Sequence, residues 1–210
     1  MQVWGTYTAV PQESPADKVG IWFTTFVFTL GKAPKHPTAT VLEADLAPMV
    51  DAAALPSPSF GDIPTGSFKG PGTSFPPAAG WVSWIGDFTA QRTAGCGAVN
   101  VTAWEGQAAV VPTMQDSDAI LNIAPLLGGQ HALLGEAGKI AAVSTYRFAS
   151  VSAAPGGGIH VVLRGKPQEK VTLLFATRGG NSFGCKSRQA VIGVDGTATV
   201  EFDGDSGSAH

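Results

Sequence analysis

Glycine and proline interrupt this sequence so often that strands and turns are favoured over long helices. The chain has 27 glycines and 15 prolines, which together make up a fifth of its 210 residues. Glycine weakens the interior of helices and strands, and proline fixes φ and removes a backbone donor. The segments between these residues are short and rich in β-branched and aromatic types. We therefore expect an all-β fold of short strands joined by turns.

Apolar patterns place the expected strands along the chain. Residues 2–10 alternate weakly, and residues 19–30 are apolar on both parities, which is typical of a strand covered on both faces. Residues 38–45 are the expected partner of residues 19–30. Further strands are expected near 81–88, 97–104, 107–113, 118–124, 140–153, 158–164, 169–176, 187–194 and 197–203.

The last strands carry the clearest alternation, and it predicts which side chains enter the core. Asp195-Gly196 predicts a two-residue hairpin between the final two strands, and residues 129–143 have room for one helical turn. The expected architecture is an antiparallel β-sandwich of jelly-roll type. The predicted inward residues are Ile159, Val161 and Leu163, then Val171, Leu173 and Phe175, then Ala198, Val200 and Phe202.

Residues 51–80 interrupt the strand pattern with six prolines and five glycines. A ladder does not run through such a segment, so we expect a long surface loop or linker there. It separates N-terminal strands in 1–50 from a main β-sandwich in 81–203, with a polar tail at 204–210. We expect 1–203 to form one domain.

Charge and hydropathy exclude several classes of partner. The formal net charge is -3 and the chain has no long basic stripe, so nucleic-acid binding is not expected. The most apolar run, 19–30, is too short to span a bilayer as a helix, so no membrane partner is expected. Six basic residues between Arg164 and Arg188, with Glu169 as the only acid, form either an anion-binding patch or a solvated hairpin face.

Cys96 and Cys185 are the only cysteines. In an oxidising compartment they would pair and close a loop of about ninety residues. The alternatives are two free structural thiols or a nucleophilic thiolate, although none of the four histidines lies in a cysteine-protease context. The chain lacks zinc-ligand spacing, and we expect no metal or other cofactor.

The tripeptide Asn100-Val101-Thr102 is an N-glycosylation acceptor if the chain is secreted, which is the localisation we expect. The first ten residues lack the basic and apolar segments of a secretory signal, so the chain is intracellular, or its signal was removed, or it is a part of a larger protein. Because side chains alternate along a strand, Asn100, Thr102 and Trp104 should share one face. If Asn100 faces solvent, Trp104 is then expected to face outward too.

Aromatic and acidic residues gather between residues 81 and 105. A sugar offers an apolar face to an indole and hydroxyl groups to carboxylates, so such a set suits carbohydrate binding. The alternative is that the tryptophans form core, as they do in many sandwiches. The candidate ligand-binding residues are Trp81, Trp84, Trp104, Asp87 and Glu105.

A carboxylate pair is the minimum for glycoside hydrolysis. Glu105 with Asp87, Asp116 or Asp118 would supply one. Asp116 and Asp118 lie two residues apart, so both point one way along a strand and form either a weak cation site or a solvated strand entry. The "GDSGS" stretch at 204–208 lacks the context of a serine-protease nucleophile.

Residues 119–176 contain an apolar strand, "APL", "ALLG", and a strand pair ending in "RGKPQEKVTLLFA". This segment resembles the C-terminal β-sandwich of glycosidases of the raffinose-synthase and alkaline α-galactosidase group. The resemblance implies an accessory role beside a glycosidase barrel. The catalytic aspartates of that family lie in the barrel, so no catalytic residue carries over.

Three functional hypotheses follow. The first is a non-catalytic, carbohydrate-associated β-sandwich, either a binding module or an accessory domain within a larger polypeptide. The second is a small polysaccharide hydrolase or lyase that uses the carboxylate pair. The third is a structural, coat or interaction sandwich that self-associates through 51–80.

Overall fold

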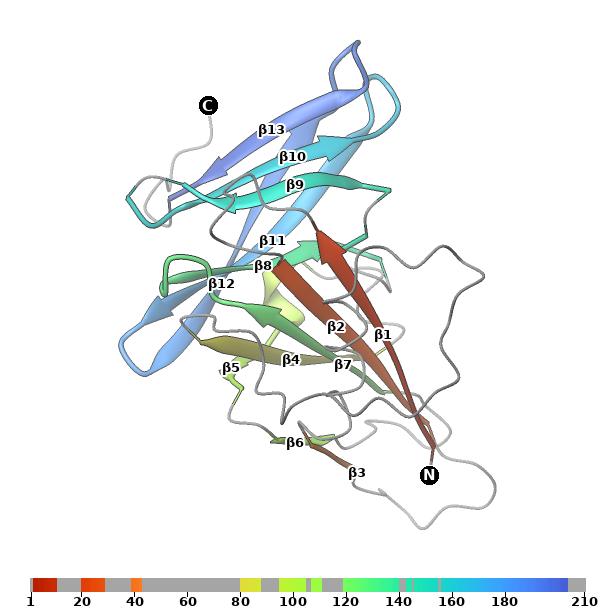
Figure 1. Ribbon diagram of the computed structural model, residues 1–210, viewed down its shortest axis with the longest axis vertical. Coiled ribbons are helices and arrows are strands. Elements are labelled where there is room, and N and C mark those ends of the chain that lie inside the picture. The colour runs from red at the N-terminus through yellow and green to blue at the C-terminus, as the bar shows by residue number, and fades with distance from the viewer. Residues whose placement is uncertain are drawn as a thin grey trace, which may run out of the picture.

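The computed structural model describes residues 2–10, 20–28, 39–42, 80–87, 95–104, 107–110, 119–139, 143–144, 146–154 and 156–203 (Figure 1). Within these ranges the chain forms strands and one short 3-10 turn, η2 (Cys96–Ala98), so the all-β prediction is confirmed. None of the described segments is a helix long and apolar enough to cross a bilayer. The strands are β1 (Gln2–Val10), β2 (Gly20–Phe28), β3 (Ala39–Leu42), β4 (Trp81–Asp87), β5 (Val101–Ala103), β6 (Gln107–Val110), β7 (Ala119–Pro125), β8 (His131–Glu136), β9 (Phe148–Ala153), β10 (Ile159–Arg164), β11 (Lys170–Gly179), β12 (Ser182–Val191) and β13 (Thr197–Phe202).

These strands form antiparallel sheets. The largest has five strands in the order β1-β2-β7-β4-β5, and two three-stranded sheets have the orders β13-β10-β9 and β12-β11-β8. A two-stranded ribbon joins β3 to β6. Figure 1 shows the β13-β10-β9 sheet at one end of the molecule and the β3-β6 ribbon at the other. The jelly-roll order predicted for these strands stays a prediction.

A single buried cluster draws side chains from the five-stranded sheet and from both three-stranded sheets. Phe175 from β11 and Phe202 from β13 stack with ring centroids 4.2 Å apart, and this contact joins the two three-stranded sheets. The indole N–H of Trp22 in β2 donates a 2.8 Å hydrogen bond to the backbone carbonyl of Leu133 in β8. This bond ties the largest sheet to the middle one.

The alternation predicted for the last strands is confirmed. Ile159, Val161 and Leu163 of β10 are fully buried, while Arg164 is exposed. The predicted inward residues of β11 and β13 also lie in the core or pack against it. Period-2 patterning therefore locates the buried face correctly where a strand covers one side of the core.

Two strand predictions are wrong in their pairing or type. Residues 39–42 do not pair with β2, because β2 pairs with β1 and β7 while β3 pairs with β6. Residues 131–136, within the expected helical turn, form β8 as an edge partner of β11. Backbone pairing across the sheet outweighs the local alanine and leucine content there.

The hairpin predicted at Asp195-Gly196 is also wrong in its partners. The turn itself exists, with Gly196 at a φ of 80° and the Asp195 carboxylate accepting bonds from the Thr197 amide and hydroxyl at 3.0 and 2.7 Å. However, β12 ends at Val191 and pairs with β11, whereas β13 pairs with β10. The turn therefore moves the chain from one sheet to another.

Gly80 is the only residue of the expected 51–80 loop within the described ranges, and the 204–210 tail lies outside them. The backbone of Gly80 precedes β4, and its carbonyl accepts a 2.9 Å hydrogen bond from the amide of Leu126. Strand β4 therefore enters the largest sheet already fixed beside the end of β7. That entry positions the tryptophans of β4.

Candidate functional site

The ribbon of β4 and β5 brings together the three tryptophans predicted as ligand-binding residues. Val82 pairs with Ala103 and Trp84 with Val101. The Trp104 amide donates a 2.9 Å hydrogen bond to the Trp81 carbonyl, which continues this register by one residue. Since side chains alternate along a strand, Trp81 and Trp104 lie on one face of the sheet and Trp84 on the other.

All three tryptophans are buried. Trp84 is 5% exposed and belongs to the central core with Trp22 and Val101, whereas Trp81 (9% exposed) and Trp104 (8%) are packed on the opposite face. The sheet therefore separates Trp81 from Trp84, although they lie three positions apart in the sequence. The three tryptophans do not form one exposed surface on which a sugar could stack.

On the face that carries Trp81 and Trp104, the side chains become more exposed along the ribbon. Next to the tryptophans, the Ser83 and Thr102 hydroxyl oxygens lie 3.3 Å apart, and Thr102 is exposed. Beyond them Ile85 is 37% exposed and Asn100 is exposed. Asn100, Thr102 and Trp104 thus share a face as predicted. The expected outward exposure of Trp104 is wrong, because packing covers that end of the face.

The structure does not bring the predicted carboxylates together as a described pair. Asp87 ends β4 and its backbone pairs with Ala119 of β7. Glu105, Asp116 and Asp118 lie outside the described residues. A catalytic pair that uses them therefore stays a prediction.

The two cysteines form a disulfide, as predicted, and this pairing rules out the free-thiol and nucleophile alternatives in the oxidised protein. Cys96 lies in η2 and Cys185 in β12, with their Cα atoms 5.2 Å apart. The bond links the segment that enters β5 to the middle sheet. A disulfide of this kind fits an oxidising compartment.

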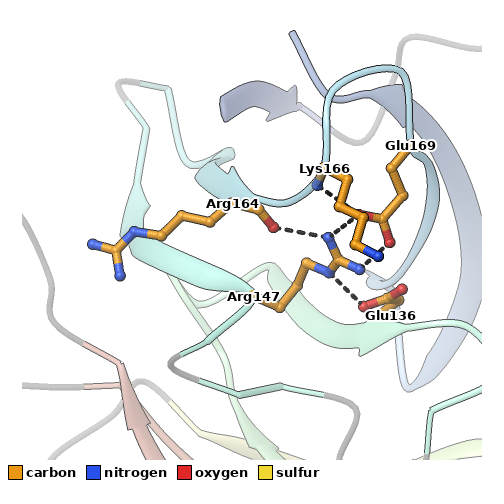
Figure 2. A network of polar contacts seen from close by, with 5 residues as sticks. All are labelled: Glu136, Arg147, Arg164, Lys166 and Glu169. Atoms are coloured by element: carbon orange, nitrogen blue, oxygen red, sulfur yellow. Dashed lines mark hydrogen bonds and ion pairs between the residues drawn. The ribbon is translucent and has the colours of Figure 1, made fainter. Parts of the chain in front are cut away.

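The sequence did not predict a polar cluster around Arg147, the residue before β9 (Figure 2). Its Nε donates to Glu136 Oε2 at 2.9 Å, and its Nη1 donates to the Arg164 carbonyl at 2.8 Å. The same guanidinium holds Glu169 through both terminal nitrogens, with Nη1 2.9 Å from Oε2. One arginine therefore joins the end of β8, the end of β10 and the loop before β11.

Gly165 makes the close approach in this cluster possible. A methyl group at that position would lie 2.6 Å from Glu169 Oε2, 3.0 Å from Ile192 Cγ1 and closer still to Arg147 Nη1. Only a residue without a side chain fits there while the ion pairs stay closed. The glycine after a run of strand residues was the one local hint that the sequence offered.

The ion pairs and hydrogen bonds of this cluster shift the pKa values of Arg147 and Glu169. The Arg147 guanidinium, together with the backbone N–H of Lys166, lowers the pKa of Glu169 from its ordinary value of 4.5 to about 2. Hydrogen bonds to Glu169 and Glu136 raise the pKa of Arg147 despite its partial burial. Arg147 and Glu169 are therefore both ionised at neutral pH.

The basic residues of the β11–β12 hairpin do not gather on one side. The register places Lys186 opposite Phe175 and Arg188 opposite Leu173, on the face that holds the core side chains of β11. Lys170 and Arg178 belong to the other parity. This arrangement favours the interpretation of a solvated hairpin over a continuous anion-binding patch.

Buried polar groups in the described part pair mainly with neighbouring strands. The Thr24 hydroxyl donates to Asn122 Oδ1 at 3.0 Å, and His131 Nδ1 lies 3.2 Å from the Thr177 hydroxyl oxygen. Among the described residues, no group of three or more His, Cys, Asp or Glu side chains is placed to hold a metal ion. These polar groups therefore stabilise the contacts between strands.

Comparisons with known proteins give no relative: no protein-family model, no curated protein sequence and no solved structure matches this chain. The resemblance of residues 119–176 to a glycosidase-associated sandwich accordingly stays a prediction. Those residues run from β7 into β11, through strands of all three larger sheets.

Proposed function

We propose that this chain is a non-catalytic, carbohydrate-associated β-sandwich, a binding or accessory domain of a glycoside-active enzyme. The observation that carries the proposal is how the chain uses its tryptophans and described acids. Trp81, Trp84 and Trp104 are packed inside, and Glu136 and Glu169 are both bound by Arg147. These side chains therefore stabilise the scaffold, which favours the non-catalytic form of the proposal.

The state of Glu169 makes that residue unsuited to the role of general acid in a hydrolase. A glycosidase needs one carboxyl group with a raised pKa, so that it carries a proton at neutral pH. Glu169 has the opposite perturbation, because Arg147 and the Lys166 amide hold its pKa at about 2. Such a group is an ion-pair partner and a poor proton donor.

The disulfide supports the extracellular setting of this proposal. Disulfides persist in proteins outside the cell, as in secreted polysaccharide-active enzymes, whereas reducing compartments keep cysteines as free thiols. The bond between Cys96 and Cys185 closes a separation of 89 residues. We therefore place the proposed function in a secreted protein.

Affinity electrophoresis through gels with single polysaccharides tests the proposal, with reducing-end release measured in parallel on the same polymers. We expect retardation by at least one polymer and release from none. The variant Trp104→Phe should migrate as the parent does, because it keeps an aromatic ring at a buried position.

Two outcomes would contradict the proposal. Release of reducing ends that disappears in Glu105→Gln would establish catalysis. Migration unaffected by every polymer in the panel would remove the association with carbohydrate. Self-association seen by light scattering would then favour the structural-protein alternative.

A further inference from the structure

The Asn100-Val101-Thr102 tripeptide lies at the end of the β4–β5 ribbon where η2 leads into β5. Asn100 is exposed and precedes β5, Val101 is buried, and Thr102 is exposed. The side chain of an acceptor asparagine must reach solvent for a large glycan to be accommodated in the folded protein. Asn100 meets this requirement, while its neighbour Val101 anchors the segment in the core.

Asn100 is exposed and precedes an edge strand of the largest sheet. Strand β5 is at the edge of the five-stranded sheet, and it is only three residues long. Continuing the β4–β5 register by one residue brings Asn100 toward Ile85, which is one of four exposed large apolar side chains in the described part of the chain. A glycan attached there would cover this apolar residue and the end of an edge strand.

A second, independent feature points to the compartment in which such transfer takes place. Cys96, four residues before Asn100, is bonded to Cys185. Disulfides form and persist in the secretory pathway and outside the cell, and N-linked glycans are added in the same pathway. The modification site and the oxidised pair therefore require the same environment.

We propose that Asn100 carries an N-linked glycan. The donor is an oligosaccharide linked to a polyprenyl pyrophosphate. The Asn100 amide nitrogen forms a bond to the anomeric carbon of the first sugar as that carbon's bond to the pyrophosphate oxygen breaks. The lipid pyrophosphate leaves, and the amide nitrogen loses one proton to the medium.

The structure also assigns the order of events. In the folded chain Val101 is buried and pairs with Trp84, and the Thr102 hydroxyl lies beside that of Ser83. For the tripeptide to enter the active site of a transferase, these contacts must be open. Transfer therefore precedes pairing of β5 with β4, and the folded protein is a poor acceptor.

Translation of the full chain behind a cleavable signal peptide, with microsomes present, tests the proposal. Translocated chain is identified by protection from added protease. We expect one glycan on the protected chain, removed by peptide N-glycosidase. The shift should be absent in Asn100→Gln and Thr102→Ala and kept in Thr102→Ser. It should also be kept in Asn181→Gln, an asparagine outside any such tripeptide.

Folded, disulfide-bonded protein offered to the same microsomes after detergent permeabilisation should gain no glycan, while the reduced and unfolded chain should gain one. Protected chain without a shift would overturn the proposal. A shift that persists in Asn100→Gln would overturn the assignment to this residue. Efficient transfer to the folded protein would refute the order of events.

Discussion

Replacing Arg147 by methionine should destabilise the fold more than any other single charge removal in the described part. Methionine keeps most of the side-chain length and removes every donor. The substitution leaves Glu136 without its 2.9 Å partner, and it removes the bonds to Glu169 and to the Arg164 carbonyl. The ends of β8 and β10 then lose the group that joins them.

The expected loss of unfolding free energy follows from the exposure of the Arg147 and Glu136 side chains. The side chains of Arg147 and Glu136 are 15% and 11% exposed, so Glu136 would remain as a largely buried, uncompensated charge. Breaking a fully buried pair costs about 3–5 kcal/mol, and the residual exposure reduces this to about 2–3 kcal/mol. For a chain of this length the midpoint of thermal unfolding should fall by about 5–10 °C. The side chain of Glu169 is 33% exposed, so the Arg147–Glu169 ion pair is not counted in this free-energy value.

Urea unfolding followed by tryptophan fluorescence measures the change, with Arg164→Met as the matched control. Arg164 is exposed, its side chain points away from the cluster in Figure 2, and only its carbonyl contacts Arg147. That variant should change the free energy of unfolding by less than about 0.5 kcal/mol. Arg147→Lys keeps the charge without the planar fork and should lose about half as much as Arg147→Met.

The double variant Arg147→Met/Glu136→Gln identifies the cause of the loss. Because glutamine removes the stranded charge, the double variant should recover roughly half of the stability lost by Arg147→Met alone. Equal stability of Arg147→Met and the Arg164→Met control would refute the reasoning. So would a double variant less stable than Arg147→Met.

Three further predictions concern the same scaffold. Changing Cys96 and Cys185 to serine should lower the free energy of unfolding by about 4.5 kcal/mol in the chain-entropy description, and equal urea midpoints for the two proteins would contradict this. Because the pKa of Glu169 is lower in the folded chain than its ordinary 4.5, its contribution to stability is present above that pH and is lost as the pH falls toward about 2. Glu169→Gln should flatten this part of a stability–pH curve, and a curve parallel to that of the parent would exclude the ion pair as the cause. Gly165→Ala should destabilise by about 1–3 kcal/mol, since its methyl group overlaps the cluster, and an unchanged thermal midpoint would show that the cluster shifts freely.

Local patterns predicted the strands and their buried faces well. Ile159, Val161 and Leu163 alternate in the sequence and are buried in β10, because the period of side chains along a strand is fixed by backbone geometry. The disulfide was also predictable, since only Cys96 and Cys185 are present. Both predictions need no knowledge of which strand lies beside which.

Pairing across the sheets was not predictable in the same way. The turn at Asp195-Gly196 is a strong local hairpin signal, yet β13 pairs with β10 because its alternate residues complete the core beside Val161. The Arg147 cluster joins residues that lie 11 and 22 positions from it in the chain. Such contacts depend on sheet order, which a single sequence does not specify.

The tryptophans show how strand parity limits arguments from sequence proximity. Trp81 and Trp84 differ by three positions, so in any regular strand they face opposite sides, and only Trp81 and Trp104 can belong to one surface. That surface runs from buried aromatic packing at Trp81 and Trp104 to exposure at Ile85 and Asn100. Within the described part of this face, a sugar therefore has access at the end that carries Ile85 and Asn100. The acceptor asparagine lies at that end, so an attached glycan would begin where the packing of the face stops.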